Sequence, residues 1–199
     1  MQDVSTRRRW LLPHWEKSGG TYFVTFRLAD SFPAAARTEI ETDRQRLIAT
    51  RKSRRLSPQE RTDLENIFSD KIQSILDASA GSCTLARPEI AEIVAGSLRA
   101  FDESRYRLYA WCVMPNHVHV IFEPRTTHHL SDIVHSWKSY SAKMANRILG
   151  RTGTFWQREY WDRLIRNDEE FSLAVAYVIG NPEKAGLRGW KWMGLANLD

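Results

Sequence analysis

The sequence has few cysteines and no long apolar run among its 199 residues. Its two cysteines, Cys83 and Cys112, are too few for a disulfide framework or a cysteine-based zinc site. No run of roughly 18 apolar residues is present, so a transmembrane helix is not expected. Residues 1–9 carry three arginines with no apolar segment behind them, which argues against a secretory signal. We therefore expect a cytoplasmic protein in a reducing setting, with no membrane contact.

Basic residues exceed acidic ones, and the excess is concentrated in one segment. The chain has 29 Lys and Arg against 24 Asp and Glu, a net charge of +5, and its pI is about 9.4. Between residues 44 and 61, seven basic residues accompany a single acid, Glu60. Arg7–Arg9 form a second cluster. Such clusters favour a polyanionic partner, because each phosphate contact releases counterions. They could also be solvated helix faces.

Alternating and helical patterns predict the order of the secondary structure. Expected strands are 21–28, 106–114, 118–123 and a short one near 162–166; expected helices lie within 33–100, at 130–149 and from 168 to about 180. This order is that of a ferredoxin-like α+β sandwich. We expect an antiparallel sheet with helices on one face, and a basic helical insertion at 31–100 after the first strand. Residues 1–199 are expected to form a single domain.

Two histidines lie two residues apart on a predicted strand. His117 and His119 therefore leave the same face of the sheet, while Val118 and Val120 leave the other. Two neutral imidazoles that point the same way make half a metal site. Structural or surface histidines would give the same pattern, since His-x-His is a weak signal and no Cys, Asp or Glu lies within two residues. A third ligand must come from elsewhere in the fold.

A tyrosine and an asparagine occupy one edge of the last predicted helix. Tyr177 lies off the centre of the apolar face, and Asn181 follows one turn later on the same edge. A phenol beside an amide oxygen would suit a nucleophile next to a ligand for a hard cation. The alternative is an amphipathic tyrosine at a helix edge, with Asn181 as the C-cap before Pro182.

Three further groups of residues have open interpretations. Residues 156–161 mix aromatic rings with side chains that can bond base edges, which suits the stacking of unpaired bases but also a small core under the sheet. Tyr140 competes for the nucleophile role, although its place on an apolar stripe favours core packing. Arg7–Arg9 could bind phosphates or form a disordered arm. The predicted nucleic-acid-binding residues are Arg7, Arg8, Arg9, Arg51, Lys52, Arg54, Arg55, Trp156, Gln157, Arg158, Tyr160 and Trp161.

Three motifs occur in the order and spacing of a known family. They are MPNHVH at 114–119, GTFWQ at 153–157 followed by Tyr160-Trp161, and YVIGNP at 177–182 followed by Ala185-Gly186. Together they resemble the HUH-type Y1 (IS200-like) transposases, in particular the branch called REP-associated tyrosine transposases. The resemblance covers the strand at 20–28 and nearly everything from 105 to 187.

The resemblance implies a ferredoxin-like enzyme that cuts and rejoins single-stranded DNA at hairpin-associated sites through a 5′-phosphotyrosine. It implies that Tyr177 is the nucleophile, that His117 and His119 bind Mg²⁺ or Mn²⁺, and that Asn181 is the polar metal ligand one turn later. The implied partner is single-stranded DNA with REP-like hairpins, bound by a monomer or a homodimer. The segment 31–100 is longer and more basic than the family leads us to expect, so its role does not transfer.

Two other functions are compatible with these residues. One is a non-catalytic, single-stranded nucleic-acid-binding regulator built on an RRM-like sheet. The other is a zinc-dependent hydrolase, which the lack of a carboxylate near the histidines weakens. Covalent protein–DNA adducts separate the proposed enzyme from the regulator, because a protein that only binds DNA cannot form them.

Overall fold

The computed structural model describes residues 4–9, 12–17, 19–32 and 80–196, together with the isolated positions 38, 42, 45, 49 and 74. The isolated positions are all helical, as expected for the segment 31–100. Most of that segment, including Arg51, Lys52, Arg54 and Arg55, lies outside the described residues.

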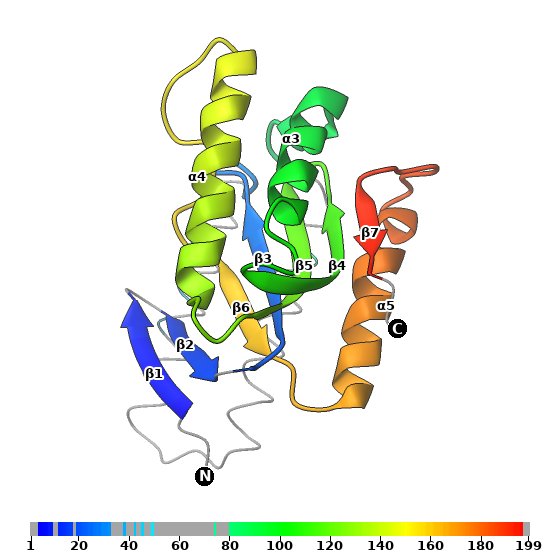
Figure 1. Cartoon of the computed structure of the whole chain (residues 1–199). Helices are drawn as coiled ribbons and strands as arrows, with labels where there is room; N and C mark the ends of the chain where they lie inside the picture. Colours follow the sequence, from blue (N-terminus) through cyan, green and yellow to red (C-terminus); the bar gives the residue numbers. More distant parts are fainter. Residues whose placement is uncertain are drawn as a thin grey trace.

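Five strands form one antiparallel sheet in the order β6-β3-β5-β4-β7. Their bounds are β3 Tyr22–Arg27, β4 Tyr106–Val113, β5 His117–Pro124, β6 Trp161–Leu164 and β7 Met193–Leu195. The predicted strands are therefore confirmed, and β7 was not predicted. A separate hairpin of β1 (Val4–Arg9) and β2 (Leu12–Lys17) precedes the sheet (Figure 1). Arg7–Arg9 thus belong to a paired strand, so the alternative of a disordered arm is wrong, and their binding to phosphates stays a prediction.

Helices cover both faces of the sheet. Two of them, α3 (Pro88–Arg99) and α4 (Leu130–Ile148), contact each other and pack on one face, as predicted (Figure 1). A short 3-10 helix, η1 (Thr84–Ala86), precedes α3. The third helix, α5 (Asp168–Lys184), packs on the opposite face of the sheet. The expectation that all helices lie on one face is therefore wrong. Within the described part of the chain, no helix is both long and apolar enough to cross a membrane.

Strand alternation explains why two cores form. Val118, Val120 and Phe122 of β5 point into the larger core under α3 and α4, whereas Ile121 points into the smaller core under α5. The apolar stripe of α5 includes Val178, which is completely buried. A central strand with apolar side chains on both faces requires a cover on both faces, because each exposed apolar surface would cost free energy in water.

The buried stripe of α4 does not include Tyr140. It runs through Trp137, Ser141 and Ala145, at the i, i+4 spacing of one helix face. Tyr140 lies beside this stripe and is 54% exposed, so the expectation that it packs in the core is wrong. The polar atom of the buried indole is satisfied, since Trp137 Nε1 donates to the Tyr106 hydroxyl at 2.9 Å.

The described residues that flank the segment 33–79 contact each other. The backbone N–H of Ser82 donates to Asp30 Oδ2 at 2.9 Å. Gly81 has φ +93°, and a Cβ atom there would lie 2.5 Å from the Asp30 carbonyl oxygen, so only glycine permits this approach. The carbonyl of Ala80 accepts a hydrogen bond from the Asn116 side chain at 3.1 Å. These flanking residues therefore meet beside the residue that precedes His117.

Candidate active site

The two histidines face each other on the α5 side of the sheet. Both are fully buried, and their Nε2 atoms lie 2.8 Å apart. In the sheet register His119 lies opposite Thr25 of β3 on one side and Cys112 of β4 on the other. The prediction that both imidazoles leave the same face is confirmed.

Asn116 determines the tautomer of His117. Its Nδ2 donates to the carbonyl of Ala80, which directs its Oδ1 toward His117 Nδ1 at 2.6 Å. An amide oxygen only accepts, so His117 Nδ1 must donate. The Nε2 atom of His117 therefore presents a lone pair toward His119.

Thr25 permits either tautomer of His119. Its hydroxyl lies 2.9 Å from His119 Nδ1 and can donate or accept. When Thr25 donates, His119 Nε2 carries the proton and donates it to His117. When Thr25 accepts, both Nε2 atoms present lone pairs at 2.8 Å, an arrangement that needs a cation between them. Two nitrogens about 2.1 Å from one ion and at right angles would be about 3 Å apart, so the spacing suits shared coordination.

Burial keeps both imidazoles neutral. It lowers the pKa of His117 to about 3. Burial, and then the charge that His117 would carry, holds the pKa of His119 well below its ordinary value. Neutral imidazole is the form that binds a metal ion, because a protonated ring has no free lone pair.

Tyr177 lies against this pair from α5. Its ring is half-buried and meets the His119 ring nearly edge-on at 5.4 Å between centroids. It also packs on Phe23 of β3 at 6.0 Å. The helix that carries it begins at the cap residue Asn167, whose side chain accepts from the Glu170 N–H at 2.8 Å.

Asn181 completes the cluster from one turn further along α5. It is 1% exposed, and its Oδ1 is the buried side-chain oxygen or nitrogen that finds no partner among the described residues. Its Nδ2 lies 3.5 Å from His119 Nε2, at the outer limit of a hydrogen bond. The helix continues through Pro182 to Lys184 and is capped by Ala185. The alternative that Asn181 is the C-cap is therefore wrong.

The donor set fits a divalent cation. Among the described residues no three His, Cys, Asp or Glu side chains are grouped for a metal ion, so any third protein ligand must be of another type. A half-turn of the Asn181 amide exchanges its two terminal atoms and directs the unpartnered Oδ1 at the imidazole pair. A buried amide oxygen without a donor is costly, and a cation would remove that cost.

Lys184 is a charged neighbour of the tyrosine that the sequence reasoning missed. Its Nζ lies 5.3 Å from the centre of the Tyr177 ring, and its side chain is exposed. The i, i+7 spacing of the two residues puts them on one face of α5, and this signal was available in the sequence. A lysine there places positive charge beside the phenol ring.

The two tryptophans expected to stack on bases, Trp156 and Trp161, lie on opposite faces of the sheet. Trp156 is 5% exposed; its Nε1 donates to Ser141 Oγ at 3.0 Å, and its ring packs on Phe26. It is a core residue, and its prediction as a base-stacking residue is wrong. Trp161 is half-buried on the α5 side, edge-on to Phe23 at 5.5 Å.

The remaining residues of this segment are held by a lysine of α4. Lys138 Nζ donates to the carbonyls of Gln157 and Arg158, both at 2.8 Å, and lies 5.8 Å from the centre of the Tyr160 ring. Burial lowers the pKa of Lys138 to about 8. Gln157 and Tyr160 are half-buried and Arg158 is exposed, and their binding to nucleic acid stays a prediction.

Comparison with protein families identifies the region that holds the site. Residues 86–180 match the family model described as "Transposase IS200 like". Over these residues the chain is similar to the IS200-like transposases. The match includes the imidazole pair and Tyr177 and ends one residue before Asn181. The predicted resemblance to the Y1 transposases is confirmed.

One curated protein and two solved structures that resemble this chain are described as transposases. A Haemophilus influenzae protein named "Putative REP-associated tyrosine transposase" is 25% identical over 91 residues, which cover 41% of this chain and 52% of the relative. The match thus spans about half the length of that relative. A solved structure of a REP-associated tyrosine transposase bound to a REP hairpin is 20% identical, with a TM-score of 0.43, and covers 92% of this chain and 76% of its own. Another solved structure, described as a "putative transposase" from Deinococcus radiodurans, is 12% identical, with a TM-score of 0.35. The match covers 81% of this chain and 89% of the chain in that structure.

Proposed function

We propose that the chain is a metal-dependent endonuclease and strand transferase that acts on single-stranded DNA beside hairpins. The observation that carries this proposal is the convergence of a tyrosine, two neutral imidazoles and an unpartnered amide oxygen on one face. The family match and the names of the relatives support the same class of activity.

Tyr177 is the proposed nucleophile. Its Oη attacks the scissile phosphorus, the bond from phosphorus to the 3′ oxygen breaks, and the phenolic proton passes to solvent. The products are a 5′-phosphotyrosine and a free 3′-OH. Because one phosphate ester replaces another, attack by a 3′-OH on the phosphotyrosine rejoins strands without ATP. A single nucleophile forms one covalent link at a time.

His117, His119 and Asn181 are the proposed ligands for Mg²⁺ or Mn²⁺. When bound, the ion supplies Lewis-acid polarisation of the non-bridging phosphate oxygens. Two nitrogen donors favour Mn²⁺ over Mg²⁺, which prefers an all-oxygen shell. Asn116 and Thr25 act as positioning residues, because their hydrogen bonds hold the outer nitrogens of the two rings.

The proposed substrate is single-stranded DNA with a REP-like hairpin. The solved relative described with a REP hairpin supports the choice of probe, and the basic clusters supply charge for a phosphate backbone. A single domain over 1–199, a monomeric or homodimeric state and a cytoplasmic setting stay predictions.

The test is covalent trapping of DNA on the protein. The wild-type chain, incubated with a single-stranded hairpin library and Mn²⁺, is expected to form an adduct that survives denaturing electrophoresis. Tyr177→Phe keeps the ring but lacks the attacking oxygen, so it should bind hairpins with unchanged affinity and form no adduct. Peptide mapping of the wild-type adduct should place the DNA on the peptide that contains Tyr177.

Tyr140→Phe is the matched control, since Tyr140 is an exposed phenol on α4, which packs on the other face of the sheet. It should form adduct at the wild-type rate. Adduct formation by Tyr177→Phe would exclude this nucleophile. Tight hairpin binding by the wild-type chain with no adduct in Mn²⁺ or Mg²⁺ would favour the non-catalytic regulator.

A further inference from the structure

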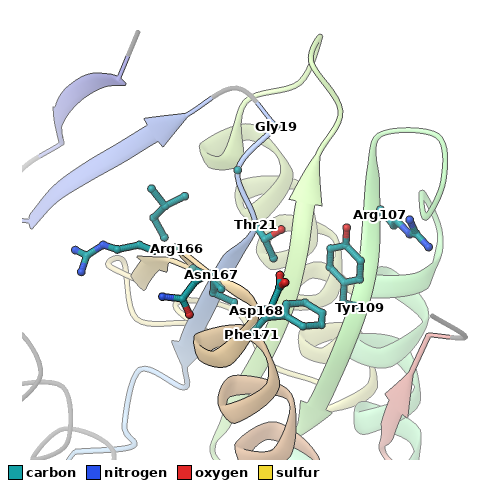
Figure 2. A pocket seen from close by; sticks show the side chains of 11 residues that line it. Gly19, Thr21, Arg107, Tyr109, Arg166, Asn167, Asp168 and Phe171 are labelled. Carbon is teal, nitrogen blue, oxygen red and sulfur yellow. The ribbon is translucent and has the colours of Figure 1, made fainter. Parts of the chain in front are cut away.

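A second concave site lies on the α5 side of the sheet, at the start of α5. The cavity has a volume of about 510 Å³, within the range of about 300–1,000 Å³ typical of small-molecule sites. Its wall comes from four parts of the chain: the turn before β3, β4, the end of β6 and the first turn of α5 (Figure 2). This volume is sufficient for a nucleobase.

One wall of the cavity is aromatic. Tyr109 and Phe171 pack edge to face with their centroids 5.2 Å apart, and both rings are half-buried. The Tyr109 hydroxyl donates to Glu123 Oε2 at 2.8 Å. Burial and this carboxylate raise the pKa of Tyr109, so the ring is an uncharged phenol held in one orientation. Aromatic side chains bind unpaired bases of any sequence by stacking, because every base has a π-face.

Asp168 is exposed and supplies an acceptor at the cavity. Its carboxylate points toward Thr21 and Tyr109 (Figure 2), and no described residue forms a hydrogen bond or an ion pair with it. The adjacent cap residue differs, because Asn167 Oδ1 already accepts from the Glu170 N–H. An available carboxylate accepts hydrogen bonds from the amino group of a base.

Two arginines flank the opening. The guanidinium of Arg107 lies 5.4 Å from the centre of the Tyr109 ring, and its recorded acidic neighbour, Glu103, is 4.0 Å away and exposed. Arg166 lines the cavity next to Asp168 and is exposed. Arginines at the rim of a base-sized cavity suit the phosphates on either side of a bound nucleotide.

The cavity and the candidate active site lie on the same face of the protein. Asp168 and Tyr177 are nine residues apart on α5, about 13 Å along the helix axis. His119 and Glu123, four residues apart on β5, also point to this side of the sheet. A strand that crosses Tyr177 can therefore reach the cavity without passing around the sheet.

We propose that this cavity binds one unpaired base of the DNA strand near the scissile phosphate and selects a base with an amino group. Asp168 accepts a hydrogen bond from the amino group of adenine, cytosine or guanine. It disfavours thymine, which has no amino group and whose N3–H lies between two carbonyl oxygens that repel the carboxylate. Phe171 supplies the stacking surface. This inference rests on the proposed function for the strand that it binds, but base selection does not require cleavage.

The test is selection from a DNA hairpin library with randomised single-stranded flanks, without metal so that no strand is cut. The pool bound by the wild-type chain should be depleted of thymine at one flank position by at least about fivefold, the lower end expected for one specific base contact. Asp168→Asn should restore thymine at that position, since an amide can also donate to a carbonyl. Glu169→Gln is the matched control, because it removes the same charge from the same helical turn and Glu169 does not line the cavity. This variant should show the same depletion of thymine as the wild-type chain.

A second variant tests the stacking surface. Phe171→Leu keeps apolar bulk in the smaller core but removes the ring, so it should weaken binding to flanked hairpins by at least about fivefold. Its affinity for the same hairpin without flanks should not change.

Equal thymine depletion by wild type and Asp168→Asn, or no depletion by wild type, would overturn the proposal. Base selection without a covalent adduct would instead refute only the proposed cleavage, whereas an adduct without base selection would refute only this cavity's role.

Discussion

Thr25 is expected to control metal binding through the His119 tautomer. Thr25→Val keeps the shape of the side chain but removes the oxygen that accepts from His119 Nδ1. The tautomer with a free Nε2 lone pair then loses its support, and Mn²⁺ affinity should fall by about 10- to 100-fold, as for other residues that hydrogen-bond a metal-binding histidine. Isothermal titration calorimetry measures this change. Thr25→Ser restores the hydroxyl and should restore the Mn²⁺ affinity. If Thr25→Val binds Mn²⁺ as tightly as the wild-type chain, Thr25 does not control metal binding.

The neutral imidazoles should make stability depend on pH in acid. The pKa of His117 is about 3 in the folded chain and 6.5 ordinarily. Between these values the unfolded chain binds a proton that the folded chain does not, so the free energy of unfolding should fall as the pH drops below 6.5. For this residue the loss approaches about 1.4 kcal/mol per pH unit. Urea denaturation of the metal-free protein at several pH values measures it. His117→Gln should reduce the slope, and an unchanged slope would contradict the assignment.

Sequence patterns predicted the candidate ligands but not their supporting residues. His117, His119, Tyr177 and Asn181 stand in local motifs whose spacing indicates a shared face. Thr25 is 94 residues from the histidine that it contacts, and the sequence contains no periodicity that joins them. Only the strand register brings such residues together.

The smallest strand of the sheet depends on a close contact with an indole. Gly194 of β7 pairs with Trp111 of β4, and a Cβ atom on Gly194 would lie 2.5 Å from Trp111 Nε1. Trp111 is buried, so Gly194→Ala should displace the ring or the strand and lower the free energy of unfolding by about 1–3 kcal/mol. Urea denaturation measures the change.

Gly96, in α3, is the matched control for this substitution. A Cβ atom there would meet nothing within 4 Å, and alanine is the better helix former by about 0.5–1 kcal/mol. Gly96→Ala should therefore raise the free energy of unfolding. A Gly194→Ala variant as stable as wild type would show that the Trp111 contact does not restrict β7.

Secondary structure was predictable where one segment alone determined it. The strands at 106–113 and 117–124 and the helix at 130–148 show clear periodicity. A three-residue strand has too few positions to show any, and β7 forms because the edge of β4 offers backbone partners. The side of the sheet that α5 covers was not predictable either, because an apolar stripe identifies a buried helix face but not the sheet face that buries it.

At the scale of the whole molecule, charge should determine how binding responds to salt. Replacing Arg51, Lys52, Arg54 and Arg55 with Gln removes four charges from the most basic segment. If these residues contact DNA, affinity should fall for all sequences alike, and the slope of log affinity against log salt should become shallower by about 0.7 for each lost contact to a single strand. Fluorescence anisotropy over a series of salt concentrations measures the slope.

The control for this variant is a pair of arginines that already have acidic partners. Arg87 and Arg99 form ion pairs with Glu89 and Glu92 at 2.5 and 2.7 Å. Replacing both with Gln should leave the slope close to that of the wild-type chain. If the four-residue variant also keeps the wild-type slope, the basic segment does not contact the DNA backbone.

Asp30 lies in direct contact with Gly81 and Ser82, so the described residues on either side of the segment 33–79 are held together. The cost of closing a chain between two such fixed points grows only with the logarithm of its length, about 0.6 kcal/mol for each doubling, so a change in the number of residues between them should cost the sheet little. Ala80 has less freedom. The carbonyl of Ala80 orients the Asn116 amide and, through it, the proton on His117. A displacement of Ala80 would thus act directly on a ring of the candidate active site.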